Sequence, residues 1–372
     1  MTDISKLDRA MAPKAAADGL EWYDAAALGI EGKGWADTQR PYDRLPGRAQ
    51  LTVPEAVWSL SRHSAGMSVR FVTDSPTIAA RWVLGSENLA MSHMPASGVS
   101  GLDLYTRPDG RWRWCGFGWP NNPAALKPED VGLPAGERPC RVGATLIDGI
   151  DPAPDGREYR VYLPLYNATL SLEIGIKPGC RLLVAPPENH APIVFYGTSI
   201  VQGGCASRPG MSHCAILGRR LDRPIINLGF SGNGRMEQAM ADLIAELRAS
   251  AFVLDCVPNM ANDPIYERTM YMVQALRAKH PTTPVVLVED RTLDNAPFLE
   301  GRRKQHARNR ELLRRAWIDL QAAQVAGLYY IDGPPLLGND GDATVDSSHP
   351  TDLGFARMAD AMEPVLRRAM QA

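Results

Sequence analysis

The spacing of apolar and polar residues divides the chain into two parts with different rhythms. From about residue 49 to residue 185 the apolar stretches are short, and Gly, Pro, Asn and Asp separate them. Typical stretches are Met67–Val72, Ile78–Val83 and Leu170–Ile174. Short, evenly spaced strands with turn residues between them are typical of an all-β sandwich or jelly roll. We therefore predict a jelly-roll-like β-sandwich domain over residues 1–187.

After Pro186 and Pro187 the pattern changes to short apolar runs that alternate with helical stretches. The runs predict five buried parallel strands, at Ile193–Tyr196, Ile225–Leu228, Phe252–Asp255, Val285–Val288 and Leu328–Ile331. The helical stretches are Met211–Leu221, Met236–Ala249, Tyr266–Lys279, Arg302–Ala323 and Asp352–Met370. This alternation predicts a three-layer α/β/α domain with a five-stranded parallel sheet over residues 188–372.

Composition excludes several classes of function. Lys and Arg together number 40 against 42 Asp and Glu, which leaves a net charge of −2 and no basic excess for nucleic acid or an anionic membrane. No apolar stretch approaches the ~20 residues that a membrane span needs. The six cysteines form no CxxC pair, so we expect buried free thiols and no zinc site.

The first eight residues are polar and lack the apolar core of a secretory signal. We expect a cytoplasmic location, or a secreted or periplasmic one if a leader has been removed. Composition leaves the oligomeric state open, with a homo-oligomer among the options.

The first predicted parallel strand runs directly into Gly197-Thr198-Ser199. A serine there lies at the carboxyl edge of the sheet, where open α/β folds bind ligands. A serine that caps the following helix would look the same in sequence. The segment also lacks the G-x-S-x-G elbow of α/β-hydrolases. Ser199 alone therefore does not indicate a nucleophile, and the prediction depends on residues that follow the later strands.

Polar and glycine-rich segments follow the second and third strands of this predicted sheet. The second strand ends in a run with three glycines around Gly232, without the Gly-Lys-Ser/Thr of a nucleotide-binding loop. Its backbone N–H groups can approach a ligand closely, and that of Gly232 is a candidate oxyanion donor. Asn259 follows the third strand, and its side-chain amide is a second candidate donor. Each residue is also common in ordinary turns.

Asp346 and His349 share one short loop before the last predicted helix. At this spacing the carboxylate can fix the tautomer of the imidazole, which then accepts the proton of Ser199. A solvent-exposed Asp-His pair is the alternative. Six other histidines compete for the role of base but lack an acid in this loop spacing, namely His63, His93, His190, His213, His280 and His306.

In this order and spacing, Ser199, Gly232, Asn259 and the Asp346–His349 loop resemble the SGNH/GDSL hydrolase superfamily. The resemblance covers about residues 188–372, and Thr198 stands where the name-giving motif has Asp. It implies an α/β/α hydrolase with Ser199, Asp346 and His349 as catalytic residues. The backbone N–H groups of Ser199 and Gly232 and the amide of Asn259 would form the oxyanion hole, with no metal or organic cofactor.

A second resemblance lies in the first half of the chain. Residues 101–105 read Gly-Leu-Asp-Leu-Tyr, similar to the GxDLY signature of a β-rich domain that precedes one branch of these hydrolases, and residues 205–211 are also similar to that branch. The combination implies a carbohydrate-esterase-like enzyme. Asp103, Tyr105, Gln202 and Arg208 are candidate substrate-binding residues, although a structural role is an equal alternative for Asp103 and Tyr105.

These observations lead to one function hypothesis and several rivals. We expect a serine esterase that removes a short acyl group, with acetyl favoured, from a small-molecule or oligosaccharide ester. A lipase, a thioesterase or an acyltransferase would use the same residues. Seven of the eight tryptophans precede Pro186, where they can pack in the core or bind sugar rings. A non-catalytic carbohydrate-binding protein is therefore the rival of a different class.

Overall fold

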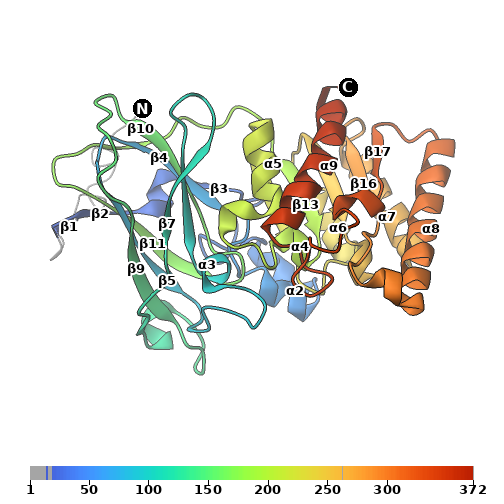
Figure 1. The fold of residues 1–372 in the computed structure, drawn as a ribbon, viewed down its shortest axis with the longest axis horizontal. Coiled ribbons are helices and arrows are strands. Elements are labelled where there is room, and N and C mark those ends of the chain that lie inside the picture. Colours follow the sequence, from blue (N-terminus) through green and yellow to red (C-terminus); the bar gives the residue numbers. More distant parts are fainter. Residues whose placement is uncertain (1–13, 16–18, 262, 372) are drawn as a thin grey trace.

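The computed structural model describes residues 14–15, 19–261 and 263–371, which form a β-rich half beside an α/β half (Figure 1). The β-rich half contains two antiparallel sheets. One has the strand order β1 (Lys14–Ala15), β2 (Glu21–Asp24), β11 (Thr169–Ile176), β5 (Ile78–Leu84), β9 (Cys140–Ile147) and β8 (Ala124–Ala125). The other has the order β12 (Leu182–Val184), β4 (Ser68–Thr73), β10 (Arg157–Tyr162), β6 (Leu102–Thr106) and β7 (Arg113–Gly118), with β3 (Ile30–Glu31) paired to β4.

Side chains from both antiparallel sheets meet in one core. Phe71 and Leu104 of one sheet and Trp82 and Ile174 of the other are fully buried in the same cluster. Inward-facing residues alternate with more exposed ones along β9, as expected for a strand with one buried face. The predicted β-sandwich is therefore confirmed.

The α/β half is built on a parallel sheet with the order β14-β13-β15-β16-β17. Its strands are β13 (Ile193–Gly197), β14 (Ile225–Gly229), β15 (Ala251–Asp255), β16 (Val285–Val288) and β17 (Leu328–Ile331). The first four of these are buried along their whole length, which explains why each reads as a continuous apolar run. The five predicted strands are confirmed to within a residue or two.

Helices cover both faces of the parallel sheet (Figure 1). One face carries α4 (Ser199–Gln202), α5 (His213–Leu221) and α9 (Asp352–Gln371). The other carries α6 (Gln238–Ile244), α7 (Ile265–Lys279) and α8 (Glu300–Ala322). The predicted three-layer arrangement is confirmed. No helix in the described part of the chain combines the length and apolar character of a membrane span.

Shorter elements connect these layers. Two short α-helices belong to the first half, α2 (Glu55–Leu60) and α3 (Ala96–Val99). Single 3-10 turns occupy Ala25–Leu28, Gly47–Leu51, Pro128–Val131, Pro209–Met211, Val257–Asn259, Ala296–Phe298 and Pro334–Leu336.

The two halves share their hydrophobic cores. Trp35, Leu45 and Val57 pack in the cluster beneath the α6–α8 face, whereas Met94 and Tyr166 pack in the cluster beneath the α4–α9 face. The last strand of the sandwich ends at residue 184 and the first strand of the parallel sheet begins at residue 193, on either side of the predicted boundary at residue 187. These five side chains precede that boundary but pack in the cores of the second half. Loops of the sandwich are therefore held firmly beside the carboxyl edge of the parallel sheet.

A buried arginine strengthens this junction. Arg44 donates hydrogen bonds to the carbonyl oxygens of Asn227 (3.2 Å) and Gly229 (2.6 Å) at the end of β14. It also donates to the carbonyls of Leu60 and His63 within its own half. Because a buried guanidinium needs several acceptors, these bonds tie the first half to the end of β14.

Candidate active site

Ser199 begins helix α4 directly after strand β13. Thr198 caps this short helix, since its hydroxyl accepts a hydrogen bond from the N–H of Ile200 (3.2 Å). The carbonyl of Ser199 accepts hydrogen bonds from the hydroxyl of Tyr166 (2.9 Å) and the N–H of Gly204 (2.8 Å). The predicted nucleophile therefore stands at the carboxyl edge of the sheet on a fixed backbone.

His349 and Asp346 meet Ser199 from the loop before α9. The Oγ of Ser199 lies 2.8 Å from Nε2 of His349, and Nδ1 of that ring lies 2.7 Å from Oδ2 of Asp346. The other oxygen, Oδ1, accepts the backbone N–H groups of Ser348 and His349. A carboxylate beside Nδ1 places the proton on that nitrogen and leaves the lone pair of Nε2 facing Ser199.

The carboxylate of Asp346 is held in its charged form. Partial burial alone would raise its pKa, but the hydrogen bonds from the backbone and ring of His349 and from Ser348 outweigh burial and lower the pKa below 3.8. The acid therefore stays ionised at neutral pH. The three side chains form a continuous path along which His349 can take the proton of Ser199 and Asp346 can stabilise the resulting imidazolium.

The loop after β14 lies against the end of strand β13. The N–H of Phe230 donates to the carbonyl of Gly197 (2.9 Å). A Cβ atom at Gly234 would stand 1.8 Å from the same carbonyl oxygen, so this position accepts only glycine. Gly232 is exposed at φ +69°, a left-handed backbone conformation that favours glycine. The backbone N–H groups of Gly232 and Ser199 have no hydrogen-bond partner within the described chain.

Asn259 ends the 3-10 turn that follows β15 and faces the same loop. Its side-chain Nδ2 lies 3.5 Å from the carbonyl oxygen of Gly234, at the long limit of a hydrogen bond. An amide nitrogen carries two hydrogens, so the second can point to a ligand. The structure thus brings Ser199, His349 and Asp346 into contact and places Gly232 and Asn259 on adjoining segments.

Gln202 has a different position from the one predicted. It is fully buried one turn after Ser199, so it does not face a substrate. Its Oε1 accepts the N–H of Ser231 (3.1 Å), and its Nε2 donates to the carbonyl of Leu165 and to Nδ1 of His63 (3.1 Å each). Burial and the nearby Arg44 lower the pKa of His63 to about 3, so its ring is neutral. Gln202 therefore anchors the loop of Gly232 to the helix of Ser199.

Asp103, Tyr105 and Arg208 contact one another at the junction of the two halves. Asp103 is fully buried, and its Oδ2 accepts from Arg208 (2.7 Å) and from the N–H of Gly210 (2.8 Å). Its Oδ1 accepts from the indole of Trp114 (2.8 Å), and the Tyr105 hydroxyl accepts from Arg208 (2.7 Å). These contacts agree with the structural role for Asp103 and Tyr105, which hold the loop that carries Arg208. The side chain of Arg208 is 23% exposed.

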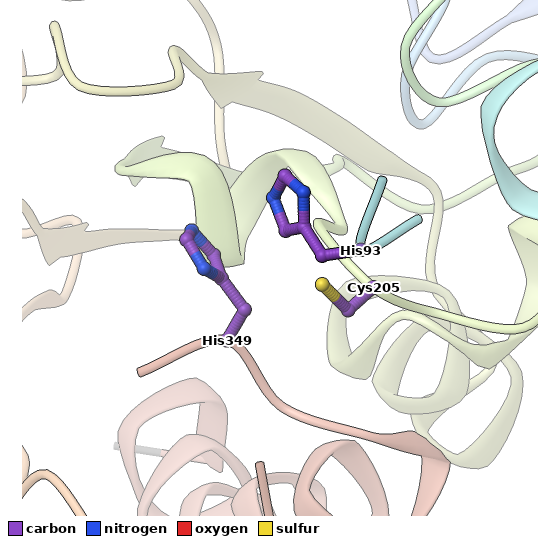
Figure 2. A group of neighbouring side chains, drawn as sticks. All are labelled: His93, Cys205 and His349. Carbon is purple, nitrogen blue, oxygen red and sulfur yellow. The ribbon is translucent and has the colours of Figure 1, made fainter. Parts of the chain in front are cut away.

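Two further side chains border His349 (Figure 2). The ring of His93, from a loop of the β-rich half, lies 5.5 Å from that of His349 between centroids. The thiol of Cys205 points between the two rings. Burial, with a smaller contribution from Asp346, raises the pKa of this thiol to about 12. In the sequence His93 stands out only as a rival base, because no local pattern marks a loop residue that reaches across to the other half.

Comparisons with known proteins agree with this geometry. Residues 190–367 match the model of the GDSL-like lipase/acylhydrolase family. Residues 20–182 match the model of GxDLY, the N-terminal domain of SGNH-hydrolase-type esterases. A GDSL-like lipase from Bacteroides ovatus is 33% identical, with a TM-score of 0.85 over 95% of this chain and 98% of its own. The chain belongs to the GDSL-like lipase/acylhydrolase family. The predicted family and the predicted GxDLY domain are both confirmed.

Two less similar solved structures share the fold of this GDSL-like hydrolase. The salicylyl-acyltransferase SsfX3 from a tetracycline biosynthetic pathway is 19% identical, with a TM-score of 0.71 over 95% of this chain and 98% of its own. A family two carbohydrate esterase from Clostridium thermocellum, solved with cellohexaose, is 14% identical, with a TM-score of 0.57 over 82% and 93%. A search of curated proteins finds no significant match.

Proposed function

We propose that this GDSL-like hydrolase is a serine esterase that removes short acyl groups, acetyl above all, from carbohydrate esters. The observation that carries the proposal is the chain of contacts from Ser199 Oγ through His349 to Asp346, at 2.8 and 2.7 Å. Both distances are those of hydrogen bonds, and the backbone N–H groups of Ser199 and Gly232 have no hydrogen-bond partner among the described residues. An activated serine next to oxyanion donors is the arrangement that acyl transfer needs.

The mechanism follows from the positions of these groups. Ser199 Oγ attacks the ester carbonyl while its proton moves to Nε2 of His349. The N–H groups of Ser199 and Gly232 and the amide of Asn259 stabilise the oxyanion. The C–O bond to the alcohol then breaks, and the alkoxide takes the proton from His349. A water molecule repeats the sequence in the second half-reaction, which releases the acid and restores Ser199.

Two exposed tryptophans, one in strand β7 and one directly after it, support the proposal that the alcohol part of the ester is a carbohydrate. Trp114 and Trp119 are 52% and 58% exposed, whereas Trp22, Trp35 and Trp82 are buried in the core. The hydrogen bond from Trp114 to Asp103 fixes its indole ring. A fixed and exposed aromatic face suits the apolar face of a sugar ring. The carbohydrate esterase with the same fold was solved with a bound cello-oligosaccharide.

Hydrolysis of p-nitrophenyl acetate by Ser199→Ala tests the nucleophile. We expect activity to fall by about 10³-fold or more, since only the oxyanion donors and binding would remain. Ser171→Ala, on an exposed position of β11, is the matched control and should keep full activity. A Ser199→Ala variant with the activity of the parent protein would exclude the mechanism.

A substrate panel tests the acyl and alcohol parts separately. We expect kcat/KM to fall from acetyl to butyryl to octanoyl esters of p-nitrophenol, and acetylated xylose or cellobiose to be deacetylated. A preference for octanoyl esters would indicate a lipase. Sugar binding without any ester hydrolysis would indicate a carbohydrate-binding protein.

Acyl transfer is the second candidate, because Ser199 is only 8% exposed and an acyltransferase shares the fold over most of the chain. A buried acyl-serine is shielded from water and reacts with whichever acceptor reaches it. Products of p-nitrophenyl acetate turnover with added cellobiose distinguish the two outcomes. Acetylated cellobiose in excess over free acetate would identify a transferase.

A further inference from the structure

His93, Cys205 and His349 form a cluster with the donor set of a zinc site. One nitrogen of each imidazole and the sulfur of Cys205 all lie within 4.8 Å of one another. Figure 2 shows the thiol pointing between the two rings. Two imidazoles and one thiolate are donors that Zn²⁺ prefers, and three protein ligands leave a fourth position for water. The proposed acyl transfer needs none of the metal chemistry that such a cluster offers.

We propose that Zn²⁺ binds to His93, Cys205 and His349 and thereby inhibits the enzyme reversibly. The proposed binding of Zn²⁺ needs only these three side chains as ligands, whereas the proposed inhibition of ester hydrolysis rests on the proposed function. Coordination replaces the S–H bond of Cys205 with an S–Zn bond and releases that proton to solvent. No electron is transferred, and a chelator reverses the step.

The position of Asp346 determines which nitrogen of His349 is available. Nδ1 carries the proton that it donates to Asp346, at 2.7 Å, so only Nε2 has a lone pair for a metal. Metal-bound histidines commonly donate their other ring N–H to a carboxylate, and Asp346 supplies that partner here. Nε2 is also the atom 2.8 Å from Ser199 Oγ. A bound metal and the serine proton therefore compete for one lone pair, which is the physical basis of inhibition.

The framework around the cluster limits how far each ligand must move. Tetrahedral zinc with N and S ligands separates its donor atoms by about 3.3 to 3.6 Å, so the donors must approach by roughly 1 Å. His93 is half-buried, and its neighbour Met94 is anchored in the core of the α/β half. Cys205 sits in a turn closed by the hydrogen bond from the N–H of Ala206 to the carbonyl of Gly203 (3.1 Å). Side-chain rotation of His93 supplies most of the required movement.

Cobalt titration of the whole protein tests the site without reference to catalysis. The protein is stripped with EDTA, desalted and titrated with Co²⁺, whose thiolate complexes absorb strongly in the near ultraviolet. We expect one equivalent to produce this band, and Zn²⁺ to displace it. Cys205→Ser should abolish the band, and His93→Gln should weaken binding by about tenfold or more. The matched controls are Cys180→Ser and His190→Gln, on half-buried and exposed positions away from the cluster.

Hydrolysis of p-nitrophenyl acetate is followed in parallel, with each variant compared with its own EDTA-treated activity. We expect Zn²⁺ to inhibit the wild type and both controls, and about tenfold more Zn²⁺ to be needed for His93→Gln and Cys205→Ser. A cobalt band that persists in Cys205→Ser would overturn the site, and zinc binding without inhibition would overturn the regulatory role. A protein without esterase activity would overturn the proposed function alone, because the band still reports binding.

Discussion

Replacement of Gln202 by methionine should impair catalysis by displacing the loop after β14, which contains Gly232. The Oε1 of Gln202 holds the N–H of Ser231, the residue before the predicted oxyanion donor Gly232. Methionine has about the same length and volume but cannot accept that bond or donate to Leu165 and His63. The loop then loses its link to the helix that carries Ser199.

The size of the loss in stability follows from the three groups that lose their hydrogen bond to Gln202, namely those of Leu165, Ser231 and His63. The carbonyl of Leu165 is buried and would cost about 1–3 kcal/mol when unpaired. The N–H of Ser231 is half-buried and can recover part of its bonding from water, whereas the buried ring of His63 recovers little, so we expect a total loss of about 2–5 kcal/mol in the free energy of unfolding. A domain with typical stability stays folded after such a loss. Displacement of one oxyanion donor should lower kcat by about 10²–10³-fold.

Urea unfolding and the kinetics of p-nitrophenyl acetate hydrolysis measure the two effects separately. We expect a lower kcat with a nearly unchanged KM, because the donor acts in the transition state. Gln238→Met, at an exposed position that begins α6, is the matched control and should change neither quantity. A Gln202→Met variant that loses stability but keeps kcat within about twofold would refute the link between this side chain and the oxyanion loop.

Three further predictions test other parts of the structure. Asn259→Ala should lower kcat by about 10²–10³-fold without a change in the urea midpoint, and a kcat that stays at the wild-type value would exclude Asn259 as an oxyanion donor. Tyr166→Phe removes the hydroxyl bonded to Ser199 and should lower the free energy of unfolding by about 1 kcal/mol in urea. Burial, with Arg291 nearby, lowers the pKa of His213 from 6.5 to about 3, so the unfolded chain binds a proton first as the pH falls. Between pH 7.5 and 5, wild type should therefore lose about 2 kcal/mol more stability than His213→Phe, and equal losses in urea unfolding would contradict this pKa.

The sequence pattern predicted the parallel sheet because its strands are buried on both faces. A strand such as β15 must then be apolar at each position, and the helices between strands show their own period. Ser199, Asn259 and Asp346–His349 were predicted as candidates for a related reason. Parallel strands end at a common edge, so residues that follow different strands converge without any local signal between them.

The roles of Gln202 and Asp103 were not predictable from local sequence. Both are polar residues in motifs that resemble functional segments, and the chain pattern does not reveal that they are fully buried. Their bonds join segments that lie 29 and 105 residues apart, respectively. Which partner satisfies a buried amide or carboxylate depends on how the two halves pack.

The sequence by itself determined the two architectures, the edge that carries the candidate site and the order of its main residues. Each of these follows from local periodicity or from the rule that parallel strands end together. Only the tertiary structure placed His93 and Cys205 beside His349 and tied Arg44 to the end of β14. These contacts join residues far apart in the sequence, and those of His93 and Arg44 cross between the two halves of the chain. No repeating pattern of apolar residues constrains which side chains meet there.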